Sequence, residues 1–382
     1  MAATERLGGV LAATLLLPGL AAVSTVHAEE PPDQAVIAFK YGYYRDWQPG
    51  LDRVKVASPQ LYLLTPFAGQ WSLEAATVSD SVSGATPRMH TTRSGATPAM
   101  SDHRSATDVK VTRYFHRGSI AVGAGYSGEN DYVSHSQNVE ARWSTEDNNR
   151  TWVAGYGHSG DVIDNTGSGG SVEDQHRQTR EFMVGVTQVA TANDVVQAFF
   201  TRSNGRGYFS DPYKDFDQRP DSRRASITLL RWNHHLEKFD ATVRSSWRYY
   251  QDSFGIRSHT LAAEWVQPVG VWTITPGLRY YMQSAASFYY DPVTDAQGVP
   301  SSLLTRRYAS NLEGYYSPDQ RLSAFGAVTA SVKVAYAFSE ATSVDLKVEQ
   351  YRQSSGLRFG GGSPYLDPFR ASFVQFGVSH KF

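Results

Sequence analysis

The chain has 382 residues, with 36 lysines and arginines against 37 aspartates and glutamates, and it contains no cysteine. The net charge of -1 gives no basic field for a nucleic-acid partner, and the absence of cysteine excludes thiolate metal sites and cysteine nucleophiles. Aromatic residues make up 13% of a chain whose mean hydropathy is -0.41. That combination fits a soluble all-β protein or a membrane β-barrel, and it excludes a helical membrane protein.

The only long apolar run lies at residues 7–26, near the start of the chain. Val26 and Ala28 stand at the third-last and last positions before the expected cleavage point, as in secretory signal peptides. We therefore expect residues 1–28 to be removed and residues 29–382 to form a single exported domain. A retained membrane anchor is the alternative, and the proline inside this short run argues against it.

Alternation of apolar and polar residues dominates the sequence after this run. From Ala35 to Tyr43, apolar or aromatic residues stand at every second position, with Lys40 and Gly42 on the opposite face. The same period recurs at 120–126, 139–143, 328–338 and 344–348. A period of two indicates β-strands, because successive side chains in a strand point to opposite faces.

The predicted connections between these strands fall into two groups by length. Short turns occur near 65–70, 115–118, 146–149, 190–194, 236–239, 268–270 and 339–342. Between them lie the long loops 81–104, 161–177, 205–222, 284–322 and 355–369, and three short connections on the same side, near 47–51, 130–134 and 252–255. Tight turns at one end and long loops at the other are typical of an outer-membrane barrel. A soluble β-sandwich, the alternative, gives no reason for this segregation.

The intervals between the connections hold about sixteen strands, within a range of roughly fourteen to eighteen. An even number returns the chain to the periplasmic side, as in single-chain bacterial barrels. The predicted fold class is therefore an all-β, transmembrane antiparallel outer-membrane β-barrel. A barrel of this size encloses a lumen wide enough to hold water.

Aromatic residues collect where the strands are predicted to end, as rings do at membrane interfaces. Near the short turns these are Trp71, Trp143, Trp152, Trp265 and Trp272. At the other strand ends a predicted outer girdle comprises Tyr43, Tyr44, Trp47, Tyr249, Tyr250, Tyr280, Tyr281 and Tyr351. The last alternating strand ends in Phe382, an aromatic terminus that resembles the insertion signal of bacterial outer-membrane barrels.

Charged residues on the face opposite the predicted lipid face should point into the lumen, because charge in hydrocarbon is costly. They are Lys40, Lys55, Glu74, Asp108, Lys110, Glu140, Arg142, Glu181, Arg244, Arg248, Glu264, Arg279, Lys333, Asp345, Lys347 and Glu349. The balance of acids and bases predicts no strong ion-selective field. Two interpretations remain open: a weakly selective aqueous pore, or a wall of paired charges that stabilises a narrow or plugged barrel.

Loop 81–104 contains the string SGATP twice and is a candidate constriction folded into the lumen. Its candidate residues are Arg88, His90, Arg93, Asp102, His103 and Arg104. Serine, histidine and aspartate all occur there, but proximity in sequence is not a catalytic triad. We therefore assign no catalytic residue and expect no enzymatic activity.

Loop 205–222 offers carboxylates at short spacing, which are the hard oxygen ligands that calcium prefers. They are Asp211, Asp215, Asp217 and Asp221. The alternative is that Arg206, Lys214 and Arg219 pair with these carboxylates in a salt-bridged loop. No other cofactor is expected, since the sequence has no phosphate-binding loop, dinucleotide motif or zinc-protease motif.

Several longer strings carry a family resemblance, among them DRVKVASPQLYLLTP at 52–66, SDPYKDFDQRPDSR at 210–223 and LRYYMQSAASFYYDP at 278–292. Together they resemble the bacterial family catalogued as domain of unknown function 3570, over nearly the whole mature chain. The resemblance implies an exported outer-membrane β-barrel without an agreed biochemical function. It also implies a redox context, because family members are often encoded near flavin-attaching and thioredoxin-like proteins.

The leading functional hypothesis is a porin-like channel for small polar solutes in a Gram-negative outer membrane, with loops 81–104 and 284–322 as candidate constrictions. A non-conducting scaffold that docks a periplasmic redox or assembly partner is the alternative. A barrel enzyme is a third, disfavoured hypothesis. The expected partners are outer-membrane lipid and the barrel-insertion machinery.

Overall fold

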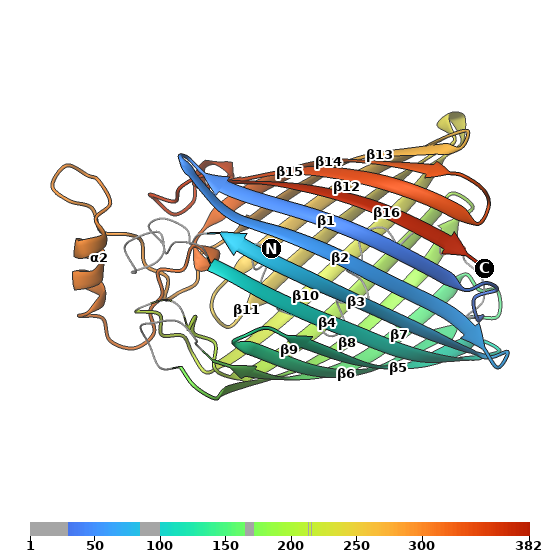
Figure 1. Ribbon diagram of the computed structural model, residues 1–382, viewed down its shortest axis with the longest axis horizontal. Coiled ribbons are helices and arrows are strands. Elements are labelled where there is room, and N and C mark those ends of the chain that lie inside the picture. The colour runs from blue at the N-terminus through green and yellow to red at the C-terminus, as the bar shows by residue number, and fades with distance from the viewer. Residues whose placement is uncertain (1–29, 85–99, 165–171, 213, 215) are drawn as a thin grey trace.

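The computed structural model describes residues 30–84, 100–164, 172–212, 214 and 216–382, and these residues form a closed antiparallel barrel of sixteen strands. Each strand pairs with its neighbours in sequence, and β16 returns to pair with β1 (Figure 1). The strands are β1 Val36–Gln48, β2 Leu51–Phe67, β3 Trp71–Gly84, β4 Met100–Phe115, β5 Gly118–Gly128, β6 Tyr132–Ser144, β7 Arg150–Ile163, β8 Gln175–Thr191, β9 Asp194–Gly207, β10 Ser222–Leu236, β11 Ala241–Asp252, β12 Arg257–Val269, β13 Trp272–Gln283, β14 Phe325–Ala337, β15 Thr342–Ser354 and β16 Phe369–Lys381. The predicted fold class and strand number are confirmed.

The barrel closes where its first strand, β1, pairs with its last strand, β16. Val36 on β1 lies opposite Lys381 on β16, and the backbones of Ala35 and Phe382 exchange two hydrogen bonds of 2.9 Å. Both strand ends lie on the side of the short turns (Figure 1). The predicted signal peptide, residues 1–28, lies outside the described residues. Among the residues that are described, no helix is long and apolar enough to cross a membrane.

Side chains alternate between the two surfaces of the barrel wall. On β1, Phe39 and Tyr41 are each 44% exposed on the outside, whereas Ala38 and Lys40 on the inside are 3% and 7% exposed. Large apolar residues stay exposed on the outside of most strands, which suits a surface in contact with lipid acyl chains. The polar residues between them line the lumen.

Tryptophans on the outside mark the end that carries the short turns. Trp143 and Trp152 lie directly opposite each other on β6 and β7 and are 56% and 51% exposed. Arg117 stacks over Trp143 at 4.8 Å. Rings and cations at this level are expected of a membrane–water interface.

The predicted outer girdle is only partly correct. Tyr249 and Tyr280 face outward, but their neighbours Tyr250 and Tyr281 face the lumen, and Tyr250 is only 2% exposed. Tyr44 and Tyr351 also face inward, as their pairing with inner-face residues requires. Adjacent residues of a strand point to opposite faces, so a Tyr-Tyr pair supplies one girdle residue and not two.

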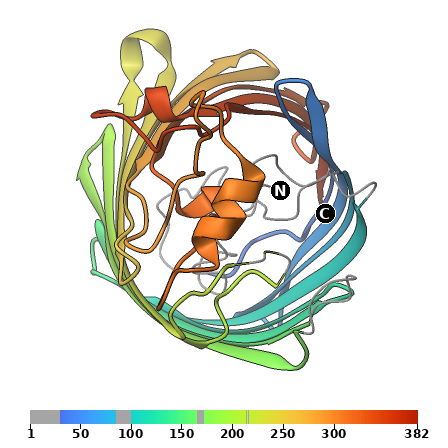
Figure 2. The same ribbon diagram turned by 90° about the vertical axis from the view of Figure 1, so that its left-hand side faces the viewer.

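Three connections at the opposite end pack into a cap, which we define as residues 208–221, 253–256 and 284–324. Its apolar core includes Phe254, Ile256 and Leu322, each no more than 1% exposed. The cap contains α2 (Ser302–Ala309), which sequence analysis did not predict; the Ser301 side chain accepts a hydrogen bond from the Leu304 amide at its start. Seen from this end, α2 overlies the barrel opening in projection (Figure 2), and it stands beyond the strand ends (Figure 1).

Short 3-10 turns complete the described secondary structure. They are η2 Glu237–Phe239, η3 Gln320–Leu322 and η4 Ser355–Leu357. η3 belongs to the cap, and the Asp319 side chain accepts a hydrogen bond from the Arg321 amide at its start.

Candidate functional site

The lumen is the candidate functional site, and most of its wall carries charges that neutralise one another. The inner faces of β3–β8 hold ion pairs Glu74–Lys110 (2.7 Å), Glu140–Arg142 (2.7 Å), Asp80–Arg104 (3.6 Å) and Asp161–Arg177 (2.6 Å). On β14 and β15, Lys333 pairs with Asp345 (3.8 Å) and Lys347 with Glu349 (3.0 Å). Opposite charges at these distances cancel most of each other's field in the lumen.

Glycines leave room for the lumenal carboxylates. Gly377 on β16 lies directly opposite Asp345, and a Cβ at Gly377 would lie 2.5 Å from Asp345 Oδ2. Gly125 on β5 stands in the same relation to Asp108 on β4. Lys40 and Glu181 also face inward and are 7% and 2% exposed, so their side chains are buried within the wall.

The wall formed by β10–β13 differs from the rest. Arg231, Arg244 and Arg279 face inward there, and none of the three forms an ion pair within 4.0 Å in the part of the chain that is described. The inward-facing carboxylates of this wall are Glu264, directly opposite Arg244 in the register, and Asp252, which pairs with Arg223 at the long-loop end. Arg248 lies on the same wall and stacks over the ring of Tyr250 at 5.5 Å. This wall therefore presents net positive charge to the lumen.

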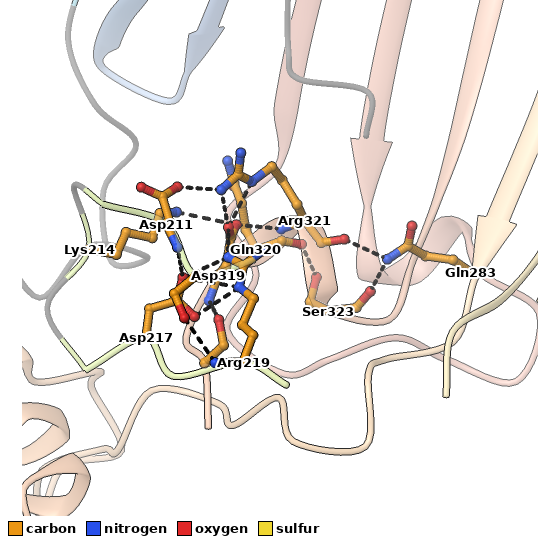
Figure 3. Close-up of polar contacts among 11 residues, drawn as sticks. Asp211, Lys214, Asp217, Arg219, Gln283, Asp319, Gln320, Arg321 and Ser323 are labelled. Atoms are coloured by element: carbon orange, nitrogen blue, oxygen red, sulfur yellow. Dashed lines mark hydrogen bonds and ion pairs between the residues drawn. The ribbon is translucent and has the colours of Figure 1, made fainter. Parts of the chain in front are cut away.

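A buried ion-pair cluster holds the cap together (Figure 3). The Asp319 carboxylate is 0% exposed and lies 3.2 Å from Lys214 Nζ, 2.7 Å from Arg219 Nη2 and 2.7 Å from Arg321 Nε. Arg219 also pairs with Asp217 at 2.7 Å, and Arg321 pairs with Asp211. The cluster joins the connection after β9 to the connection after β13.

Neighbouring charges in this cluster shift the pKa values of Asp319 and Arg219. Burial alone would raise the pKa of Asp319, but the positive charges of Arg321, Lys214 and Arg219 hold that pKa well below its usual value. Burial likewise opposes the charged form of Arg219, while Asp217 and Asp319 raise its pKa above the usual value. Asp319 and Arg219 are therefore both charged at neutral pH.

Hydrogen bonds attach the cluster to the barrel wall. The Gln283 side chain, at the end of β13, donates to the backbone oxygens of Arg321 (2.9 Å) and Ser323 (2.7 Å) (Figure 3). Gln218 and Tyr316 exchange backbone hydrogen bonds of 2.8 Å between the two connections. The Gln283 contacts thus fix the cap to the rim of the lumen, and the Gln218–Tyr316 pair joins the two connections within the cap.

Two of the four carboxylates in the calcium hypothesis, Asp211 and Asp217, form ion pairs with arginines. Asp211 pairs with Arg321 and Asp217 pairs with Arg219, while Asp221 immediately precedes β10. Asp215 lies outside the described residues. Among the residues that are described, no group of three or more aspartate, glutamate or histidine side chains is arranged to hold a metal ion.

The alternative to calcium is that Arg206, Lys214 and Arg219 pair with the carboxylates of the loop, and the structure places these three basic residues differently. Arg219 pairs with Asp217, Lys214 pairs with Asp319 on the other connection, and Arg206 faces outward on β9. Salt-bridged loop packing therefore exists, but its central carboxylate, Asp319, is one that sequence analysis did not select.

The residues of the candidate constriction loop 81–104 are divided. Arg88, His90 and Arg93 lie outside the described residues. Asp102, His103 and Arg104 lie in β4, which begins at Met100, and not in a loop as predicted. Arg104 faces the lumen and donates to Ser127 Oγ at 2.9 Å, whereas His103 faces outward between Ser79 and Ser81. Both strands continue beyond the expected loop boundaries, so the connection is shorter than predicted.

The prediction that Lys55 faces the lumen is wrong. Lys55 pairs with Arg45 across β1 and β2 on the outer face, near the long-loop end. Charge at this height is accessible to water and headgroups, so the rule that charged residues face the lumen does not apply there. Sequence analysis also missed Arg231, although its flanking residues Leu230 and Trp232, 42% and 45% exposed on the outside, imply its inward direction.

Comparisons with known proteins agree with this architecture. The chain matches the model of the family described as "Protein of unknown function (DUF3570)" over residues 7–366. A search of curated proteins found no match. Among solved structures, a bacterial polysaccharide outer membrane secretin is similar, with a TM-score of 0.51 and 7% identity over 93% of this chain and 100% of that chain.

Two further barrels are similar at lower scores. The CymD monoaromatic hydrocarbon channel has a TM-score of 0.44 and 8% identity, covering 91% of this chain and 88% of that chain. A Pseudomonas aeruginosa FadL homologue has a TM-score of 0.41 and 10% identity, covering 91% and 89%. At such identities the likeness concerns the barrel fold alone. By the match over nearly its whole length, the chain belongs to the DUF3570 family of proteins of unknown function.

Proposed function

We propose that this protein is a porin-like channel of the bacterial outer membrane that passes small polar solutes and prefers anions. The observation that carries the proposal is the β10–β13 wall, where Arg231, Arg244 and Arg279 face the lumen without an ion-pair partner in the described part of the chain. A guanidinium stays protonated at any physiological pH. Fixed positive charge in a cleft lined by protein raises the local concentration of anions.

The rest of the inner wall supports selectivity by this one face. The ion pairs of β3–β8, β14 and β15 leave little net field, so the unpaired arginines determine the sign of the preference. The cap supports control at the outer mouth, since its packed core of Phe254, Ile256 and Leu322 lies at the long-loop end of the barrel. In this proposal the connection 284–324 is the constriction, and the Asp319 cluster holds it in place.

Solute efflux from vesicles tests the proposal. Purified protein is reconstituted with a small anionic or a small cationic solute of matched size inside the vesicles. We expect faster efflux of the anion, and we expect the triple variant Arg231→Gln, Arg244→Gln, Arg279→Gln to remove the difference. A matched control removes the same charge from the outer face and should behave as wild type. It is the triple variant Arg113→Gln, Arg150→Gln, Arg257→Gln. Equal efflux of both solutes from wild-type vesicles would contradict the anion preference.

The packed cap favours a second candidate, a non-conducting scaffold that docks a periplasmic partner. Under that function a folded barrel releases neither solute. It would also release neither after Asp319→Asn loosens the cap, because the lumen itself would then be closed or occupied. Efflux that appears only in the Asp319→Asn variant would instead favour a channel with a closed mouth.

A further inference from the structure

The outer surface near the long-loop end carries an excess of positive charge. Outward-facing basic side chains there are Arg45, Lys55, Arg180, Arg202, Arg206, Arg224, Arg257, Arg352 and Arg370. Among the described strand residues of that half, the outward-facing carboxylate is Asp52, and Arg45 engages it at 2.7 Å. Such an excess on a membrane-facing surface suits an anionic headgroup.

Four of these arginines form a cluster on β8–β10, which we call the arginine cluster. Asn204 on β9 lies directly opposite Arg180 on β8 and Arg224 on β10, so the three share one row on the outer face. Arg202 and Arg206 flank Asn204 on its own strand. Neighbouring strands lie about 4.8 Å apart and diagonal neighbours about 7 Å apart, so four long side chains can reach one group.

Nothing in the described part of the chain neutralises this cluster. Arg202 Nη1 donates to Ser226 Oγ at 2.6 Å, and none of the four arginines forms an ion pair with a carboxylate there. Like charges on adjacent strands destabilise a sheet unless an anion lies between them. The same arrangement recurs on the far side of the barrel, where Arg352 on β15 lies directly opposite Arg370 on β16.

An apolar hollow lies on the outer face of the same region, across β8–β13. It has a volume of about 690 Å³. The small residues Ser245 and Ala263 lie directly opposite each other in its floor, and Trp247 and Leu261 flank them in the next row. Small residues between large ones produce a depression in a lipid-facing wall.

The distance from the hollow to the arginine cluster matches one leaflet of a membrane. Six residues separate Leu230, which lines the hollow, from Arg224 on the same strand. At about 3.3 Å per residue and a tilt near 40°, that is about 15 Å along the barrel axis. Half of a hydrocarbon core of about 30 Å is the same depth. A lipid whose headgroup lies at the arginines would therefore have its acyl chains beside the hollow.

We propose that the outer face of β8–β13 binds a phosphorylated, acylated lipid of the outer leaflet. Its phosphate lies on Arg180, Arg206 and Arg224, because guanidinium groups bind phosphate with paired, charge-assisted hydrogen bonds. One acyl chain fills the hollow beside Trp247. The proposal rests on the outer-membrane location and not on conduction, so lipid binding and solute passage are tested separately.

Native mass spectrometry of the full chain in detergent tests this site with lipid A as the probe. Wild type is expected to retain the bisphosphorylated form and to lose it when both phosphates are removed. The variant Arg206→Gln, Arg224→Gln should bind the bisphosphorylated form about thirtyfold more weakly, since each basic residue near an anionic surface contributes about fivefold. The matched control Arg113→Gln, Arg150→Gln removes two outward arginines from the short-turn end and should bind as wild type.

A second variant tests the hollow. Ala263→Phe fills the floor from the lipid side, where it disturbs no lumenal packing. It should weaken lipid A binding and leave binding of the deacylated, phosphorylated sugar unchanged. Any one of three results would overturn the proposal. Wild type retains the dephosphorylated lipid as strongly as lipid A, or the arginine variant and its control lose binding equally. The third is equal binding of the acylated and the deacylated probes. Sheet content by circular dichroism confirms that each variant is folded.

Discussion

Arg219 Nη2 lies 2.7 Å from Asp319 Oδ2, and this contact joins two connections whose residues are one hundred positions apart in the chain. The contact is buried, since the Arg219 side chain is 10% exposed and the Asp319 side chain 0%. Removing one partner of a buried ion pair leaves an uncompensated charge, which costs about 3–5 kcal/mol. The stability of the cap therefore depends on Asp319.

Asp319→Asn should loosen the cap while the barrel stays folded. The chain has no cysteine, so Leu303→Cys on the exposed face of α2 provides a unique site for a fluorescent label. We expect lower fluorescence anisotropy of that label in the Asp319→Asn background. Glu313→Gln, an exposed residue of the same connection, is the control and should leave anisotropy unchanged. An Asp319→Asn variant with wild-type anisotropy would show that the cluster does not hold the cap.

Acid should release the cap only at strongly acidic pH. The folded pKa of Asp319 lies well below its usual value, since Arg321, Lys214 and Arg219 favour the charged form despite burial. The unfolded pKa is about 3.9, so the stabilisation is complete above that pH and is lost as pH falls through the lower folded pKa. The anisotropy of the label on α2 should stay constant from pH 7 to about pH 4 and fall below it. A midpoint at pH 5–6 would mean that another group controls the cap.

Chelation should not destabilise the protein. Asp211 and Asp217 already pair with Arg321 and Arg219, so a calcium ion would have to displace guanidinium groups. We expect the same thermal unfolding midpoint with and without a chelator in detergent solution. A lower midpoint in chelator, restored by added calcium, would revive the calcium hypothesis for loop 205–222.

Glu264→Gln should strengthen the preference for anions. Glu264 is the carboxylate directly opposite Arg244 on the β10–β13 wall, and its removal takes away the negative charge that partly offsets Arg231, Arg244 and Arg279. In planar bilayers the ratio of chloride to potassium permeability should rise relative to wild type. Glu74→Gln also removes one negative charge, but from the opposite wall, where Glu74 pairs with Lys110. Its permeability ratio provides the comparison. A lower ratio in the Glu264→Gln variant would contradict the role of this wall.

The strands could be predicted from the sequence because lipid imposes a strict alternation on them. Ile37, Phe39 and Tyr41 must face lipid, so the residues between them must face the lumen. This constraint ends where the strand leaves the membrane. β3 continues to Gly84 and β4 begins at Met100, and both faces of these extensions carry polar residues that give no periodic signal.

The outer charges and the cap could not be predicted in the same way. Lys55 lies above the hydrocarbon, where a charged residue can face either side. Asp319 meets Lys214 and Arg219 only through folding of two distant connections, and no local pattern encodes that meeting. The unpaired state of Arg231 likewise depends on neighbouring strands, although its inward direction follows from the flanking apolar residues.

The most direct test of an anion-preferring lumen is the zero-current potential of the purified full chain in a planar bilayer under a potassium chloride gradient. We expect single-channel current steps and a zero-current potential displaced toward the equilibrium potential of chloride. A folded barrel that gives no current, or a displacement toward the equilibrium potential of potassium, would contradict this expectation.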